Sequence, residues 1–265
     1  MNHPSRPSQP APKNRQARHN HPARLDEPAR YNRLARALAL VAGSVLALLT
    51  TAGCGGEPPA SLPAGAHEVS IPTEDGETLS AAVVGDGPTG VVVVHGANAS
   101  RVNWYEAGGA IAASGGLTVV MIDLRGYGSS TGERRTHLDL DIDAAARWVA
   151  EQPGVERVAL VGSSMGATAV LAMAARHPEE IAGVVALSPP GASTGQDALA
   201  GAPGLTMPLL LAAAEDDTTF AESTRRIAEA AGVEPVLVSG GGHGTGMFPD
   251  HPELVQRIAA FLAGL

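Results

Sequence analysis

The sequence predicts an α/β fold, a mostly parallel sheet of about eight strands with helices on both faces. Three observations support this prediction: short apolar runs alternate with helical patterns over about 200 residues, the later runs are continuous stretches of Val, Leu, Ile and Ala, and the first two runs flank a tight turn. Continuous apolar strands are typical of a sheet covered on both faces. Alternation of strand and helix favours parallel order. A chain segment of this length is enough for one domain with a large core, and no second boundary is predicted.

The apolar runs place the strands in order. Residues 67–71 and 78–84 meet around Asp75 and Gly76, which predicts an antiparallel hairpin at one edge of the sheet. The remaining strands are expected at 91–94, 117–124, 155–161, 183–187, 208–214 and 235–239. Helices are expected between them. Apolar residues in 142–149 follow the helical spacing behind a capping box of Thr136 and Asp139, and residues 254–262 form a similar stripe.

The first 53 residues have the composition of an export signal. Residues 1–36 carry eight basic side chains and no sustained apolar period, which predicts disorder. Residues 37–53 are uncharged and at or below the length that spans a bilayer, so they favour a signal-peptide core over a permanent membrane helix. Residues 54–66 are rich in Gly, Pro and Ala and are expected to form a flexible tether ahead of the domain at 67–265.

The only cysteine, Cys54, directly follows the apolar segment. Thr51, Ala52, Gly53 and Cys54 resemble the bacterial lipobox, although Thr51 stands where that motif usually has Leu. The resemblance implies a lipid anchor on Cys54 and attachment to the outer face of the bacterial cell membrane. The alternative is an ordinary signal peptide with an unrelated cysteine and a secreted product. A single cysteine excludes an intramolecular disulfide.

Charge and motif content narrow the classes of function. Residues 1–53 hold eight basic and two acidic side chains, so the rest keeps 10 basic and 25 acidic ones, a formal net charge of −15. Such a domain repels polyanions, and its few aromatic residues also argue against nucleic-acid binding. No cluster has metal-ligand spacing and no phosphate-binding glycine loop with its lysine is present, so no metal or cofactor is predicted.

Residues 155–177 carry the most specific chemical pattern. An apolar run ends at Val161, Gly162 to Gly166 spell GxSxG, and an Ala-rich helical segment follows. A serine at such a strand–turn–helix junction is held on a strained backbone with its hydroxyl above the sheet, and the glycines are needed because a Cβ would collide with neighbouring elements. Ser164 is therefore the candidate nucleophile, with Ser163 facing inward; the alternative is that Ser164 is only a small residue in a tight turn.

A serine nucleophile needs a base and an acid from loops at the same edge of the sheet. The loop after residue 187 offers Ser188 and no acid. The next loop, AAAEDDTTF, offers Glu215, Asp216 and Asp217, and the last, SGGGHGTGMF, offers His243 among glycines.

These motifs, VVVVHGANAS, DLRGYGSS, GSSMG, AAEDD and GGGHG, stand in an order that resembles the α/β-hydrolase family along essentially all of residues 67–265. The resemblance implies the α/β-hydrolase fold and a catalytic triad of Ser164, His243 and Asp217, with Asp216 as the alternative acid.

It further implies that the backbone amides of Ala97 and Met165 form the oxyanion hole. Asp123 and Arg125 are expected to form a structural turn, and Trp104 and Tyr105 to pack within helices. Met247 and Phe248 either line an acyl pocket or fill the core.

The segment at 188–207 bears on the substrate. Related enzymes commonly insert a lid there, whereas about 20 residues leave room for a loop or one short helix, so no large cap and an open site are expected. Small-molecule carboxylic esters are the leading substrate, with dienelactone-hydrolase-like and serine-aminopeptidase-like branches as resemblances; the first branch uses a cysteine where this chain has Ser164. Thioesters and lactones use the same machinery. A catalytically silent binding module and an acyltransferase are the alternatives, and no oligomeric state is predicted.

Overall fold

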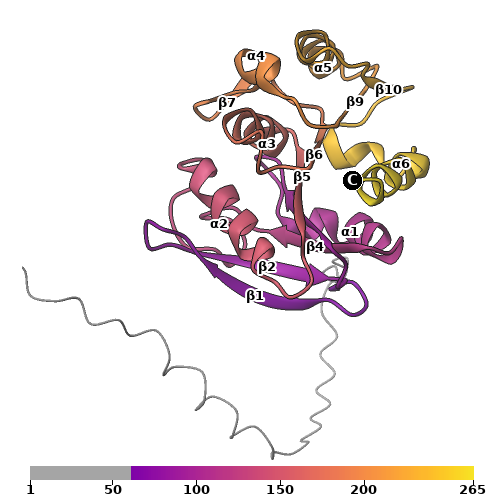
Figure 1. The fold of residues 1–265 in the computed structure, drawn as a ribbon. Helices are drawn as coiled ribbons and strands as arrows, with labels where there is room; N and C mark the ends of the chain where they lie inside the picture. The colour runs from indigo at the N-terminus through magenta and orange to yellow at the C-terminus, as the bar shows by residue number, and fades with distance from the viewer. Residues whose placement is uncertain (1–60) are drawn as a thin grey trace, which may run out of the picture. The chain divides into compact units, whose positions relative to one another are not determined.

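The computed structural model describes residues 61–265, so the predicted signal peptide, Cys54 and most of the predicted tether lie outside the described residues. An eight-stranded sheet has the order β1-β2-β4-β3-β5-β6-β9-β10 (Figure 1). The strands from β4 to β10 pair in parallel, and β1 and β2 add an antiparallel edge. The predicted sheet of about eight mostly parallel strands with one antiparallel edge is therefore confirmed. The strands are β1 His67–Pro72, β2 Thr78–Val84, β3 Thr89–Val94, β4 Leu117–Ile122, β5 Arg157–Ser163, β6 Gly183–Leu187, β9 Leu209–Ala214 and β10 Val236–Val238.

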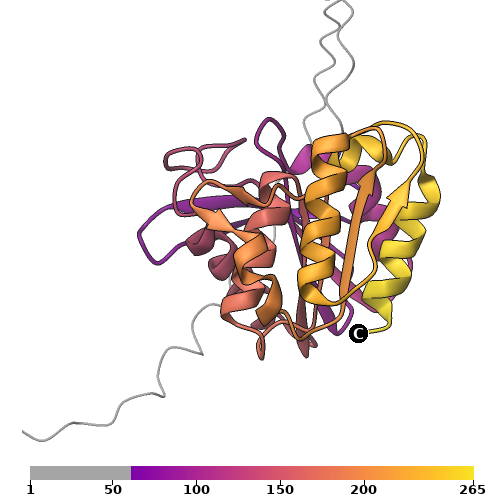
Figure 2. The ribbon, with the colours of Figure 1, turned by 90° about the horizontal axis from the view of Figure 1, so that it is seen from above.

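Helices cover both faces of the sheet. The longer ones are α1 Tyr105–Ala113, α2 Leu138–Ala150, α3 Met165–Arg176, α5 Thr218–Ala231 and α6 Pro252–Ala263, and short 3-10 helices are η1 Arg101–Trp104 and η3 Gly244–Met247. The apolar side chains of α1 and α6 join one core cluster, and those of α2, α3 and α5 join the other. Figure 2 shows α5 running alongside β9. No helix within residues 61–265 is both long and apolar enough to cross a membrane.

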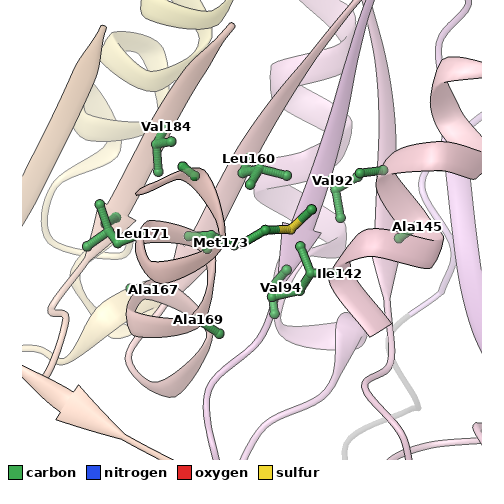
Figure 3. Packing of buried hydrophobic residues seen from close by; sticks show 14 of the residues in the cluster. Val92, Val94, Ile142, Ala145, Leu160, Ala167, Ala169, Leu171, Met173 and Val184 are labelled. Carbon is green, nitrogen blue, oxygen red and sulfur yellow. The ribbon is translucent and has the colours of Figure 1, made fainter. Parts of the chain in front are cut away.

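Alternation along the central strands divides the core into these two layers. Val92 and Val94 of β3 pack in the cluster with α2 and α3, whereas Val91 and Val93 pack in the cluster with α1 and α6. Figure 3 shows the first cluster, in which Ile142 of α2 and residues of α3 meet the strands. Each such side chain, when fully buried, contributes about 1.5–3 kcal/mol of transfer free energy. The two layers therefore stabilise the sheet, and with it the positions of the loops at the carboxyl ends of the strands.

The predicted capping box of α2 is wrong. The helix begins at Leu138, after His137 in the left-handed region with φ 45°, and no side chain caps it. Thr136 Oγ1 instead donates to the Glu133 carbonyl at 2.8 Å. The hydroxyl is therefore engaged by the preceding turn, a local competition that a sequence pattern does not show.

The segment after β6 does not form a large cap, as predicted. It contains a hairpin of two-residue strands, β7 Ala192–Ser193 and β8 Gln196–Asp197, then α4 Ala198–Gly201 and the 3-10 helix η2 Ala202–Gly204. Thr168 of α3 donates to the Pro190 carbonyl and Ser223 of α5 donates to the Pro189 carbonyl, both at 2.8 Å. The segment thus packs on these helices, and its hairpin is a feature that the expectation of a loop or one short helix missed.

Two buried arginines fasten the β1–β2 hairpin to the rest of the domain. Arg101 forms an ion pair with Glu68 of β1. Arg125 forms ion pairs with Asp75, at the hairpin turn, at 2.7 Å and with the buried Asp141 of α2 at 2.8 Å. Hydrogen bonding to Arg125 lowers the pKa of Asp75 to about 2, whereas burial raises the pKa of Asp141. Arg125 therefore has a structural role, as expected for the turn in which it lies.

Candidate active site

Ser164 lies at a sharp turn between β5 and α3. Its backbone has φ 53° and ψ −119°, a strained conformation for a residue with a side chain. A Cβ on Gly162 would lie 2.5 Å from the Gly166 carbonyl oxygen, and a Cβ on Gly166 would lie 2.6 Å from that of His95. Both glycines are therefore required by close packing, for the reason that the GxSxG pattern suggests.

His243 and Asp217 form a pair on two neighbouring loops of the same sheet edge. Nδ1 of His243 lies 2.7 Å from Oδ2 of Asp217, with 40% of the histidine side chain and 18% of the aspartate side chain exposed. The Phe220 ring lies against the imidazole, with 4.2 Å between ring centroids. Asp216 makes no side-chain hydrogen bond to any described residue. Since Nδ1 faces a carboxylate, Nε2 is left to act as a base.

The histidine loop is held against the serine turn. Gly244 has φ 58°, and a Cβ there would lie 2.0 Å from Oγ of Ser163, the residue before the candidate nucleophile. The Gly244 N–H donates to Oγ of the buried Ser188 at 3.0 Å, and Ser188 itself has φ 49°. Within residues 61–265 no hydrogen bond joins the Ser164 hydroxyl to His243. This packing nevertheless places the two residues on adjoining turns.

Ser188 is thus a site residue whose role sequence reasoning missed. It stands directly after β6, where a search for a carboxylate finds none. The only local signal is a small polar residue at a strand end, and its partner lies 56 positions further on.

The expected oxyanion donors flank Ser164. The Met165 amide is the first of α3 and points from a helix N-terminus, where backbone N–H groups have no helical partner. The Ala97 amide follows Gly96, at which a Cβ would lie 3.3 Å from the Ser164 Cβ. Neither amide has a hydrogen-bond acceptor among the described residues, so both are available to an oxygen bound above the serine.

His95 has a structural part in the same loop. The imidazole is fully buried, its Nε2 accepts from the Leu124 N–H at 3.1 Å, and its Nδ1 lies 2.7 Å from the Gly96 carbonyl oxygen. These partners require Nδ1 to carry the proton and donate, and burial lowers the pKa of His95, which keeps the ring neutral. Both ring nitrogens of His95 therefore form hydrogen bonds to the backbone, so neither can act as a base.

Four aromatic and apolar residues near the site fall mostly in the core. Trp104 and Met247 are fully buried, and Tyr105 is largely buried at the start of α1. Phe248 is half-buried and packs edge-on against Trp104, with centroids 5.7 Å apart. Met247 therefore fills the core. Among residues 61–265, no three His, Cys, Asp or Glu side chains gather in a way that could hold a metal ion.

Comparison with known proteins points to one fold. Residues 90–207 match a family model described as alpha/beta hydrolase fold. Epoxide hydrolase B of Mycobacterium tuberculosis is 35% identical over 115 residues, which are 43% of this chain and 32% of that protein. An esterase of Pyrococcus furiosus has a similar structure, with a TM-score of 0.63, 22% identity, and coverage of 74% of this chain and 91% of that one. For a dienelactone hydrolase of Anabaena variabilis the TM-score is 0.59 at 21% identity, over 76% of this chain and 96% of that one.

The chain spans about a third of the length of the epoxide hydrolase that it matches. The structural similarities, at identities near one fifth, concern the fold alone.

Proposed function

We propose that this chain, which has the α/β-hydrolase fold, is a serine hydrolase that cleaves carboxylic esters of small molecules. The observation that supports the proposal is the packing of Gly244, the residue after His243, against Ser163, the residue before the strained Ser164. A strained serine, an oriented imidazole and unoccupied amides together are the parts that acyl transfer needs.

The mechanism follows from these positions. Nε2 of His243 removes the Ser164 proton while Oγ attacks the ester carbonyl carbon, and Asp217 stabilises the imidazolium through Nδ1. The amides of Ala97 and Met165 stabilise the oxyanion of the tetrahedral intermediate. As the intermediate collapses, the imidazolium returns the proton to the leaving alkoxide and an acyl-serine forms. Water, activated by the same imidazole, then releases the carboxylate.

The openness of the site favours water as the second nucleophile. The His243 side chain is 40% exposed, and the segment after β6 packs on α3 and α5. Water can therefore reach the imidazole that would activate it, which supports hydrolysis over transfer to a bound alcohol. An uncovered site also suits short or extended acyl groups, and thioesters and lactones could follow the same route.

Labelling with a fluorophosphonate probe tests the proposal. The purified domain from Gly55 onward should be labelled, and Ser164→Ala and His243→Ala should each lose labelling because one removes the nucleophile and the other its base. His177→Ala is the matched control, since it removes an exposed imidazole at the far end of α3. A folded wild-type domain that is not labelled would refute the serine mechanism and favour a binding role.

We further propose that residues 1–53 direct export and that Cys54 carries the lipid anchor. The support is the order of basic segment, apolar segment and single cysteine in the sequence. In a bacterial host, full-length protein should fractionate with membranes and gain the mass of a lipid on its N-terminal peptide, whereas Cys54→Ala should do neither. A wild-type protein released without lipid would support simple secretion.

A further inference from the structure

The turn after β4 holds the loop that carries the Ala97 amide at three points. The Leu124 N–H donates to His95 at 3.1 Å, and the Arg101 N–H donates to Oδ1 of Asp123 at 2.9 Å. Between these two, the Tyr127 hydroxyl donates to the Ala97 carbonyl oxygen at 2.8 Å. The third contact reaches the proposed oxyanion residue itself.

The two peptide units on either side of the Ala97 Cα are thus fixed separately. The unit that contains the Ala97 N–H has its carbonyl on Gly96, and this oxygen accepts from His95. The next unit has its carbonyl on Ala97, and this oxygen accepts from Tyr127. Because a peptide unit is planar, the Gly96 carbonyl that His95 holds sets the direction of the Ala97 N–H. The hydrogen bond from Tyr127 fixes the next unit and so restrains the Ala97 Cα, about which the N–H could otherwise turn away.

The Tyr127 ring is itself immobilised. It is buried, it packs edge-on against His95 with centroids 4.7 Å apart, and the Arg134 guanidinium lies over the ring, 4.6 Å from its centroid. Because these contacts already restrict the ring, its hydroxyl can form the hydrogen bond at little further loss of entropy.

We propose that Tyr127 is a positioning residue that aligns the Ala97 amide for the oxyanion through its hydrogen bond to the Ala97 carbonyl. This role rests on the proposed serine-hydrolase function. The aligned amide should stabilise the transition state more than the bound substrate, because the ester carbonyl oxygen carries little negative charge before Ser164 attacks. Loss of the hydroxyl should therefore lower kcat and leave KM nearly unchanged.

Tyr127→Phe tests the inference, since it removes the hydroxyl and keeps the ring on His95. The matched control is Tyr105→Phe, because the Tyr105 hydroxyl has no hydrogen-bond partner among the described residues. With a short-chain p-nitrophenyl ester, Tyr127→Phe should lower kcat by ~10- to 100-fold, less than complete loss of an oxyanion donor, with KM within about twofold. The control should stay within about twofold in both.

Two further measurements separate positioning from a merely structural role. Affinity for a trifluoromethyl ketone, which Ser164 converts into an oxyanion adduct, should fall in Tyr127→Phe by about the same factor as kcat/KM, with the melting temperature nearly unchanged. Amide hydrogen exchange in a peptide covering residues 95–101 should become faster only in this variant.

The outcomes distinguish the two proposals. If the wild type is neither labelled by fluorophosphonate nor active on esters, the proposed function fails and the positioning role fails with it. If the wild type is active but Tyr127→Phe keeps its kcat within twofold, or raises KM alone, the role of Tyr127 is refuted and the serine mechanism stands.

Discussion

Replacement of Asp217 by Asn isolates the charge of the acid that faces His243. The variant keeps the size of the side chain and an oxygen that can accept from Nδ1, and it removes the negative charge 2.7 Å from that nitrogen. With roughly 4 Å between charge centres, an ion pair contributes ~4 kcal/mol at an effective dielectric constant of 20 and ~1 kcal/mol in bulk water. The pair is partly solvated, with 18% and 40% of its side chains exposed, so we expect ~2–3 kcal/mol of lost transition-state stabilisation, a fall in kcat/KM of ~30- to 150-fold.

The assay is hydrolysis of a short-chain p-nitrophenyl ester over a range of concentrations, with Asp216→Asn as the paired variant. Asp216 is exposed and has no hydrogen bond to His243, so its replacement should change kcat/KM by less than about threefold. A fall of less than about fivefold in Asp217→Asn, or an equal fall in Asp216→Asn, would refute the assignment of the acid.

Two predictions concern stability. Gly244→Ala should lower the free energy of unfolding in urea by ~1–3 kcal/mol, because its Cβ would lie 2.0 Å from Ser163 Oγ at φ 58°; adding Ser163→Ala should restore part of the loss, and a double variant no more stable than the single one would contradict this cause. Hydrogen bonding to Arg125 lowers the pKa of Asp75 from 3.8 to about 2, so its stabilisation is complete above about pH 4 and is lost as the pH falls through 2. Asp75→Asn should flatten the fall in unfolding free energy over that range, and an unchanged slope would disprove the assignment.

The strands and the serine turn could be predicted because their signals are local. Apolar runs, continuous in the central strands that lie between two helical layers, locate all eight strands of the main sheet to within a few residues. The GxSxG turn can be recognised from the spacing of its own glycines, although the close contact that requires Gly166 comes from His95, which is distant in sequence. Spacing alone could not choose between Asp216 and Asp217, since both stand on one loop; the structure places Asp217 beside His243.

The supports of the site could not be predicted, because their partners are distant in sequence. Ser188 meets Gly244 across 56 positions, and Tyr127 meets Ala97 across 30. Nothing in the sequence around Ser188 indicates that its hydroxyl accepts a hydrogen bond from Gly244. Tyr127 lies within a motif that was expected only to form a turn. Similarly, α2 lacks the predicted capping box because the Thr136 hydroxyl donates to the Glu133 carbonyl instead. Such choices follow from the assembled fold rather than from spacing.

The ion pairs of Arg101 and Arg125 with the β1–β2 hairpin affect how the domain resists a pulling force. β1 lies at one edge of the sheet and is the strand that follows residues 1–66, so any force transmitted along that segment enters the domain there. An edge strand pulled at one end can peel away one hydrogen-bonded pair at a time. The ion pair of Arg101 with Glu68 lies near the loaded end of β1, and the ion pair of Arg125 with Asp75 lies beyond its far end. β1 can therefore separate from the rest of the domain only after the ion pairs at both of its ends have broken.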